Sequence, residues 1–368
     1  MKLPIDVKAV IDEATNIDEA AKTPVSVTVY YDGTCSSDLA EHLARAYEAA
    51  APHARVSFAT LDDALACPFP GDDIAVIAAG FDERVGVAAA SLRAVGVPAM
   101  VATTLPSLVG QIAQAAGCPI PEGDIVAAGG ATVSAVKRLA DGLRGKTPAS
   151  GFAFDESEEP LPLDDERLGQ LDERMGAWII AASREKRLAF ALAFPFVRRP
   201  LSTEAVGATS MQNAGVGLVV LLPGADMPVM TLNQAKMLLQ IAAAYGQPMS
   251  LARVKELACV VGGAFAFRTV ARQVAGIVPA LGWAVKAAIG YAGTEAMGRA
   301  AIEYFENGGS VSGLAEVVGK ARDAVAQGAG CAQSVAASVA SAARAASPSM
   351  KDGGAQAAPA ATEKEIRR

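Results

Sequence analysis

Short apolar runs alternate with helical patterns over residues 23–145, and this alternation is the feature that most restricts the fold. The predicted strands are the runs at 25–31, 54–61, 73–80, 97–104 and 124–130. Continuously apolar runs such as 73–80 are typical of strands buried on both faces of a parallel sheet. Because helical segments separate the strands, a parallel sheet with helices on both sides is expected. We therefore predict an N-terminal, three-layer, Rossmann-like α/β domain.

Two helix starts are marked within this domain. Ser36 or Ser37 is the expected N-cap of the helix that follows the first strand, since a serine hydroxyl accepts a hydrogen bond from a free helical N–H group. Pro106 stands where the first turn of a helix accepts a proline.

Helical patterns dominate the rest of the chain, so an all-α helical domain is expected after the α/β domain. The predicted segments are an amphipathic helix at 1–22, a Pro-, Ser- and acid-rich linker at 146–165, the helical domain at 166–310, an Ala/Ser-rich helical extension at 311–346 and a disordered, low-complexity tail at 347–368. The first helix of the helical domain is expected to continue without a break until Pro195.

The composition permits a large core and argues against nucleic acid as a partner. Of 368 residues, 52% are apolar and 19% are charged, as in a folded chain. The formal net charge is −7, and no stretch rich in lysine and arginine carries interleaved aromatic residues. The N-terminal sequence lacks the basic and apolar regions of a secretory signal.

Cysteine and histidine are too few and too scattered to predict a metal site. The five cysteines form no CxxC pair, which fits unpaired thiols in a reducing compartment. His42 and His53 are the two histidines, and no acidic cluster adds to them at metal-ligand spacing. We therefore expect no metal.

The turn after the first strand is where a doubly wound sheet would bind a nucleotide. A P-loop needs glycines, a lysine and a Ser/Thr there, whereas this chain has Asp32-Gly33-Thr34-Cys35 with no lysine. Asp32, Thr34 and Gly129 are weak candidates for cofactor binding, and a plain capped turn is the favoured interpretation. No catalytic residue and no cofactor are predicted, since the GxSxG nucleophile motif is also absent. The sequence thus leans against an enzyme.

The helical region resembles a known family. The segments REKRLAFALAFPFVRRP at 184–200, NAGVGLVVLLPGADMPVMTLNQAKMLLQIAAAYG at 213–246 and GTEAMGRAAIEYFENGG at 293–309 are similar to the YcjF-like domain of unknown function. The resemblance covers 176–309. It implies an all-helical, GTPase-associated module of a bacterial inner membrane, with no established activity.

The resemblance also bears on the α/β domain, whose element order is similar to that of a GTPase without its nucleotide chemistry. The turn DGTCSSD replaces the P-loop, GFDERVG replaces DxxG, and Thr103-Thr104-Leu105-Pro106 replaces the guanine-reading NKxD. A degenerate GTPase-like domain and an ordinary Rossmann-like domain both fit this pattern.

The apolar helices of the second region leave three interpretations open. The best spanning candidate, 273–292, contains Pro279 and Lys286, and a buried lysine is costly in hydrocarbon. The same residues fit a buried helical core, a membrane hairpin between Glu256 and Gly298, or a glycine-rich interface with a partner helix.

The leading hypothesis is a non-enzymatic adaptor that associates with the membrane. Its expected partners are the membrane or a helical protein, with a GTPase or a second copy of the chain among them, and its expected place is the cytoplasmic side of the inner membrane. The alternatives are a cytoplasmic location and a nucleotide or metabolite sensor or enzyme with a non-standard site in the α/β domain. The interaction or structural candidates are Asp226, Gln234, Glu256, Arg268 and Thr294.

Overall fold

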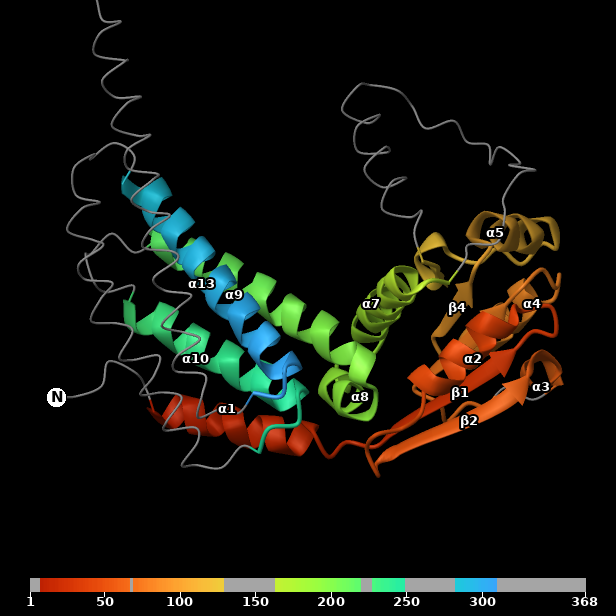
Figure 1. Cartoon of the computed structure of the whole chain (residues 1–368), viewed down its shortest axis with the longest axis horizontal. Helices are drawn as coiled ribbons and strands as arrows, with labels where there is room; N and C mark the ends of the chain where they lie inside the picture. The colour runs from red at the N-terminus through yellow and green to blue at the C-terminus, as the bar shows by residue number, and fades with distance from the viewer. Residues whose placement is uncertain (1–6, 67–68, 129–162, 220–226, 249–281, 310–368) are drawn as a thin grey trace, which may run out of the picture. The chain divides into compact units, whose positions relative to one another are not determined.

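The computed structural model describes residues 7–66, 69–128, 163–219, 227–248 and 282–309 (Figure 1). An α/β part comes first, and several helices follow it in the chain. The predicted fold class, an α/β domain with a parallel sheet followed by a helical region, is confirmed.

The sheet consists of five parallel strands in the order β2-β1-β3-β4-β5. The strands are β1 (Val25–Tyr31), β2 (Ala54–Thr60), β3 (Ile74–Ala79), β4 (Ala99–Thr103) and β5 (Ile125–Val126). This order is that of doubly wound sheets of the flavodoxin type, in which the direction of winding reverses between β1 and β3. The carboxyl ends of these two strands therefore form the topological switch point.

Alternate side chains of the central strands lie on opposite faces of the sheet. In β3, Ile74 and Val76 belong to one core cluster, while Ala75 and Ile77 belong to another on the opposite face. The second cluster includes residues of α3 (Leu61–Ala66), α4 (Val85–Ala94) and α5 (Pro106–Ala115). Helix α2 (Ser37–Ala46) contributes to the first cluster. The sheet is thus the middle of three layers, as predicted.

Local sequence signals explain where two of these helices begin. Ser36 is the N-cap of α2, and its hydroxyl accepts a hydrogen bond from Leu39 N at 3.4 Å. Pro106 is the first residue of α5, where its missing N–H group leaves no helical hydrogen bond unmade. Both predicted start signals are confirmed.

Helices α7 (Asp165–Ala182) and α8 (Arg187–Ala193) share the sheet face with α2. Met175 and Phe190 are fully buried in the same cluster as Val27 and Val76. Tyr47, just after α2, packs edge-on against Phe194, with ring centroids 5.2 Å apart. The segment that begins the helical region therefore completes one layer of the α/β sandwich.

The single helix expected to continue until Pro195 is wrong, because α7 ends at Ala182 and a turn precedes α8. The turn has a physical cause in the contacts of its residues. Lys186 Nζ lies 2.7 Å from Asp73 Oδ1, next to the start of β3. The Ser183 hydroxyl donates to Ile179 O at 2.6 Å at the end of α7. These contacts favour a bend over a straight helix, and they are not visible in helical periodicity.

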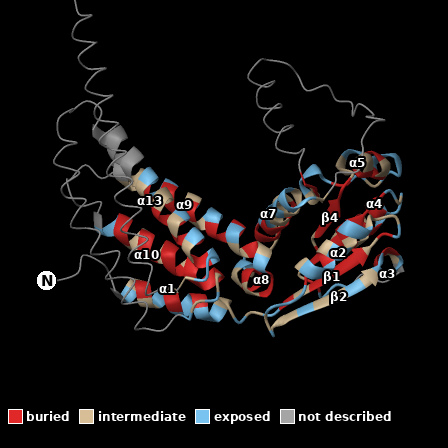
Figure 2. Cartoon of the chain, viewed as in Figure 1, coloured by how far each residue is buried: buried red, intermediate tan, exposed pale blue. Residues whose placement is uncertain are grey.

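Helices α1 (Val7–Ala20), α9 (Arg198–Val219), α10 (Met227–Ala244) and α13 (Gly282–Glu306) pack with one another around a second core. Two short helices lie elsewhere, η1 (Glu122–Asp124) before β5 and η2 (Pro195–Val197) before α9, and Val197 belongs to the first cluster. The inner faces of α1, α9, α10 and α13 are buried (Figure 2). Val10, Ala14 and Ile17 form the buried stripe of α1, and they pack in the same cluster as Leu238 of α10.

Among the described residues, none of the helices combines the length and the apolarity that crossing a membrane requires. Much of the candidate span at 273–292, and most of the hairpin between Glu256 and Gly298, lies outside the described residues.

Helices α9 and α13 approach closely at Gly298. A Cβ atom built at this glycine lies 2.2 Å from Val206 Cγ2, whereas one built at Gly293 of the same helix meets no heavy atom within 4 Å. The absence of a side chain at Gly298 is therefore what permits Val206 to pack against the α13 backbone.

We predict that Gly298→Ala lowers the free energy of unfolding by about 1–3 kcal/mol, since the added methyl group overpacks the contact with Val206. Denaturant unfolding measures the change. Gly293→Ala is the matched control, and its better helix propensity is expected to raise stability by up to about 1 kcal/mol. Adding Val206→Ala to Gly298→Ala is expected to restore part of the loss. A Gly298→Ala protein as stable as the wild type contradicts the close approach.

Candidate functional site

Doubly wound sheets bind ligands outside the carboxyl ends of their strands at the switch point, which in this sheet lies between β1 and β3. Asp32 directly follows β1 and is 2% exposed. Gly80, Phe81 and Asp82 directly follow β3. Two of the sequence candidates, Asp32 and Thr34, lie here.

The Asp32 carboxylate ties the two loops together. Its Oδ1 accepts a hydrogen bond from Thr34 N at 2.8 Å. Its Oδ2 accepts from the Thr34 hydroxyl and from Gly80 N, each at 2.8 Å, and from Asp82 N at 3.3 Å. Thr34 Oγ1 in turn accepts from Phe81 N at 2.8 Å. Four backbone N–H groups of the two loops, those of Thr34, Gly80, Phe81 and Asp82, are therefore used by protein side chains.

Shape and charge close the switch point further. A Cβ atom at Gly80 would lie 2.2 Å from the Thr34 carbonyl oxygen, so the two loops are in direct contact. The nearby guanidinium of Arg84 is neutralised by Asp82 at 2.6 Å and by Asp62 at 2.5 Å. Hydrogen bonds from Arg84 hold the pKa of Asp82 below its usual value. The charged groups described at this edge are therefore carboxylates, which repel an anion, and Arg84, whose charge is already paired.

Cys35 adjoins this turn but is a poor nucleophile. Burial, and then the charge of Asp32, raise the pKa of the Cys35 thiol to about 12. The thiol therefore stays protonated at neutral pH, whereas the thiolate is the reactive form. Within the described part of the chain, no group of three Cys, His, Asp or Glu side chains has the geometry to hold a metal ion.

The sequence candidates of the helical region divide into two sets. Asp226, Glu256 and Arg268 lie outside the described residues, as does Gly129 of the α/β domain. Gln234 and Thr294 are brought together, and Gln234 Nε2 donates to Thr294 Oγ1 at 2.9 Å.

These two residues belong to a buried polar layer between α9, α10 and α13, made of Asn213, Asn233, Gln234 and Thr294. Asn213 Nδ2 donates to Thr294 Oγ1 at 2.9 Å, and Asn233 Nδ2 donates to Asn213 Oδ1 at 3.0 Å. The Thr294 hydroxyl donates to Gly290 O at 2.8 Å. Amides and hydroxyls satisfied in this way fix the register of packed helices but offer no acid, base or nucleophile.

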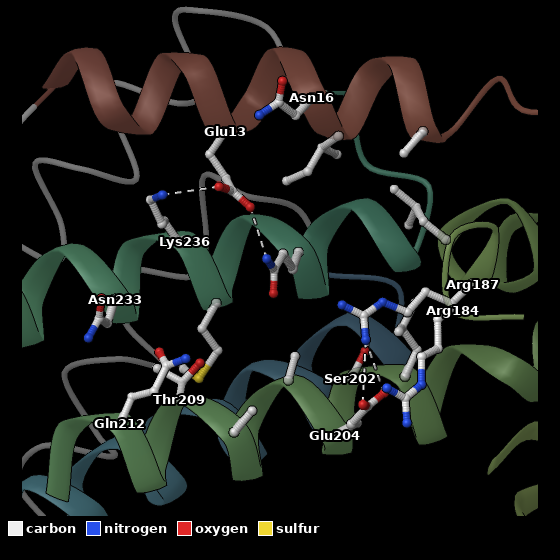
Figure 3. A pocket seen from close by; sticks show the side chains of 18 of the residues that line it. Glu13, Asn16, Arg184, Arg187, Ser202, Glu204, Thr209, Gln212, Asn233 and Lys236 are labelled. Carbon is white, nitrogen blue, oxygen red and sulfur yellow. Dashed lines mark hydrogen bonds and ion pairs between the residues drawn. The ribbon is translucent and has the colours of Figure 1, made fainter. Parts of the chain in front are cut away.

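A cleft of about 550 Å³ lies between α1, α9, α10 and the turn before α8 (Figure 3). Its lining is rich in polar residues, including Glu13, Arg184, Arg187, Ser202 and Lys236. Sequence reasoning missed the cleft, because its walls come from segments more than 200 residues apart, such as Glu13 and Lys236. No local motif marks such a site. The nearest signal was the cluster of cationic residues at 184–199, which the sequence interpretation used only for a family resemblance.

Comparison with known proteins gives no match to a family model, to a curated protein or to a solved structure. The resemblance carried by residues 176–309 therefore stays a prediction.

We predict that Asp32→Ala lowers the free energy of unfolding by at least about 3 kcal/mol, because three backbone N–H donors lose a buried acceptor. Urea unfolding followed by circular dichroism measures the loss. Asp38→Ala is the control, since Asp38 is exposed in the first turn of α2. The control is expected to cost less than about 1 kcal/mol. If the two substitutions lower the unfolding free energy equally, Asp32 does not hold the loops after β1 and β3 together as described.

A second matched pair tests the polar layer. Thr294→Val removes the acceptor of two buried amides, so we predict a loss of about 1–3 kcal/mol in unfolding free energy. Thr231 is also buried, but its hydroxyl has no hydrogen-bond partner in the described part of the chain. Thr231→Val is therefore expected to be neutral or stabilising. Equal losses in denaturant unfolding of the two variants would show that the polar layer adds nothing specific.

Proposed function

We propose that this protein is a non-enzymatic adaptor whose helical region binds a membrane or a helical partner protein. A GTPase is the partner that the family resemblance suggests, and a second copy of the chain is another. In this proposal the α/β part serves as a folded support and as a base for α7 and α8, with no nucleotide chemistry of its own.

The observation that carries the proposal is the internal satisfaction of the switch point. Asp32 and Thr34 accept hydrogen bonds from the N–H groups of Thr34, Gly80, Phe81 and Asp82. A phosphate bound there would have to displace the buried carboxylate of Asp32 or face its negative charge. Either event carries an electrostatic cost that a nucleotide site avoids by offering free N–H groups and a lysine.

The described helices also supply a rigid surface suited to binding. The polar layer and the close contact at Gly298 fix how α9, α10 and α13 pack, and a preorganised surface loses less entropy on association. Large apolar side chains are exposed on each of these helices, namely Met211, Val229 and Tyr291. Each lies within two residues of a contact of the polar layer. In this proposal these exposed apolar side chains are the groups that a helical partner or a membrane covers.

Titration of the full chain with Mg-GTP and Mg-ATP tests the proposal. We expect no turnover, and no nucleotide affinity that changes in Thr34→Ala, because Asp32 and Thr34 already accept from the N–H groups of Thr34, Gly80, Phe81 and Asp82. The result that contradicts the proposal is a Kd below about 10 μM together with hydrolysis, provided that Thr34→Ala removes both. Such a result would favour the sensor or enzyme alternative. Circular dichroism of Thr34→Ala controls for loss of fold.

Arg184→Gln is the second control in this titration. Arg184 lies in the cleft, away from the switch point. The variant therefore shows whether a nucleotide that binds the protein occupies the cleft instead of the switch point. Binding lost in Arg184→Gln but kept in Thr34→Ala does not involve the switch point and leaves the proposal standing.

A further inference from the structure

Two arginines, Arg184 and Arg187, and the buried side chain of Ser202 lie at one end of the cleft (Figure 3). Arg184 lies in the turn between α7 and α8, Arg187 is the first residue of α8, and Ser202 lies on α9. Glu204, also on α9, faces Arg187 here. The three donor side chains come from segments that the fold holds together, since α7 and α8 are anchored on the sheet.

The Ser202 hydroxyl lacks a partner. Ser202 is 1% exposed, and its Oγ makes no hydrogen bond within the described residues, although it lines the cleft. A buried hydroxyl without a partner costs folding free energy, so such groups are rare and call for an explanation. A ligand oxygen at this end of the cleft would accept the hydrogen bond that the protein leaves open.

The two arginines are available to an anion. Arg184 has no ion-pair partner among the described residues, and it is exposed. Arg187 lies 3.4 Å from both carboxylate oxygens of Glu204, which is longer than a good N–H···O hydrogen bond. Both partners of that pair are about half exposed, and such pairs contribute little. An incoming anion therefore displaces Glu204 at small cost.

The charges of the cleft lining balance, since Glu13, Glu185 and Glu204 offset Arg184, Arg187 and Lys236. Residues 184–199 contain four arginines and one lysine against one glutamate. Arg199 is paired with Glu306 at 3.1 Å and Lys186 with Asp73 at 2.7 Å, so these cations hold the structure. Arg198 Nε donates to Ala191 O at 3.2 Å. Arg184 and Arg187 remain for binding.

The opposite wall of the cleft offers neutral hydrogen-bonding groups and one satisfied ion pair. Glu13 accepts hydrogen bonds from Lys236 Nζ at 3.1 Å and from Gln240 Nε2 at 2.9 Å. Asn233 of α10 also lines this wall, and Gln212 lines the cleft from α9. The volume, about 550 Å³, lies in the range of small-molecule sites. The lining thus suits a small molecule with a polar body and an anionic end.

We propose that the cleft binds a small molecule carrying a phosphate group, with Arg184, Arg187 and the Ser202 hydroxyl donating to the phosphate oxygens. Phosphate fits better than carboxylate, because its oxygens can accept from two guanidinium groups and a hydroxyl together. The polar body of the ligand lies toward Glu13, Asn233 and Lys236. A soluble phosphate ester and the headgroup of an anionic lipid share this chemistry. The site is separate from the switch point. Binding of a soluble phosphate ester there does not depend on the proposed function, whereas a lipid headgroup in the cleft would be one form of the proposed membrane contact.

Calorimetric titration of the full chain with inorganic phosphate, glycerol 3-phosphate and AMP at constant ionic strength tests the inference. Arg184→Gln removes a charged donor, so we expect it to weaken binding by at least about tenfold. Arg299→Gln is the matched control, because Arg299 is an exposed arginine of α13 outside the cleft. The control is expected to bind as the wild type does.

Ser202→Ala tests whether the Ser202 hydroxyl binds the ligand or only contributes to stability, because the two roles predict different melting temperatures and phosphate affinities. Removing an unpartnered buried hydroxyl is expected to keep or raise the melting temperature of the free protein, yet to weaken phosphate binding severalfold. Thr231→Val also removes an unpartnered buried hydroxyl, but Thr231 does not line the cleft. It is expected to leave binding unchanged.

Flotation with phosphatidylglycerol vesicles, compared with phosphatidylcholine vesicles, separates the two sources of the phosphate. Binding of the anionic vesicles that Arg184→Gln abolishes, without binding of the soluble esters, assigns the lipid headgroup. The inference is overturned if neither vesicles nor soluble phosphates up to about 10 mM bind, or if binding persists unchanged in both Arg184→Gln and Ser202→Ala. Nucleotide turnover at the switch point would refute the proposed function without touching this result.

Discussion

Helices α2, α7 and α8 together cover one face of the sheet, and this packing determines where the turn between α7 and α8 lies. The strands carry apolar side chains on both faces, so each face needs helices that exclude water. Met175 and Phe190 provide part of that cover from a segment that follows the last strand. The turn between α7 and α8, held by Lys186 on Asp73, then carries Arg184 and Arg187 to the cleft. A packing requirement of the sheet thereby builds one wall of a site that lies outside it.

Polar groups inside the protein are treated in two different ways. Asp32 and the polar layer are saturated with hydrogen bonds from their own chain, which stabilises one arrangement and leaves nothing to offer a ligand. Among the described residues, Tyr47, His53, Ser202 and Thr231 each bury a polar atom without a partner, and of these four Ser202 lines the cleft. The switch point, where doubly wound sheets usually bind ligands, is therefore filled by the protein's own hydrogen bonds. The proposed phosphate site in the cleft keeps a hydroxyl that the described residues leave unpartnered.

The sheet was predictable because its signals are local. The run at 25–31 is β1 as predicted, and the predicted strand at 54–61 differs from β2 by a single residue, since β-branched and apolar runs need no distant partner to be recognised. The turn that separates α7 from α8 depends on Lys186 reaching Asp73, 113 residues away, so periodicity alone missed it. Gln234 and Thr294 were singled out separately, but their contact spans 60 residues and requires the packing of α10 on α13. The cleft, assembled from four segments, carries no sequence pattern at all.

Helix α1 packs against α10, and Glu13 pairs with Lys236 across 223 residues of chain. In sequence, the whole α/β sandwich is therefore inserted between α1 and the helix on which α1 rests. During synthesis, α1 emerges before the strands and α10 after them, so the buried stripe of Val10, Ala14 and Ile17 is covered only once α10 has been made. Contacts between near neighbours in the chain close at a lower entropic cost than such a distant contact. The second core therefore depends on a contact that encloses the whole α/β segment.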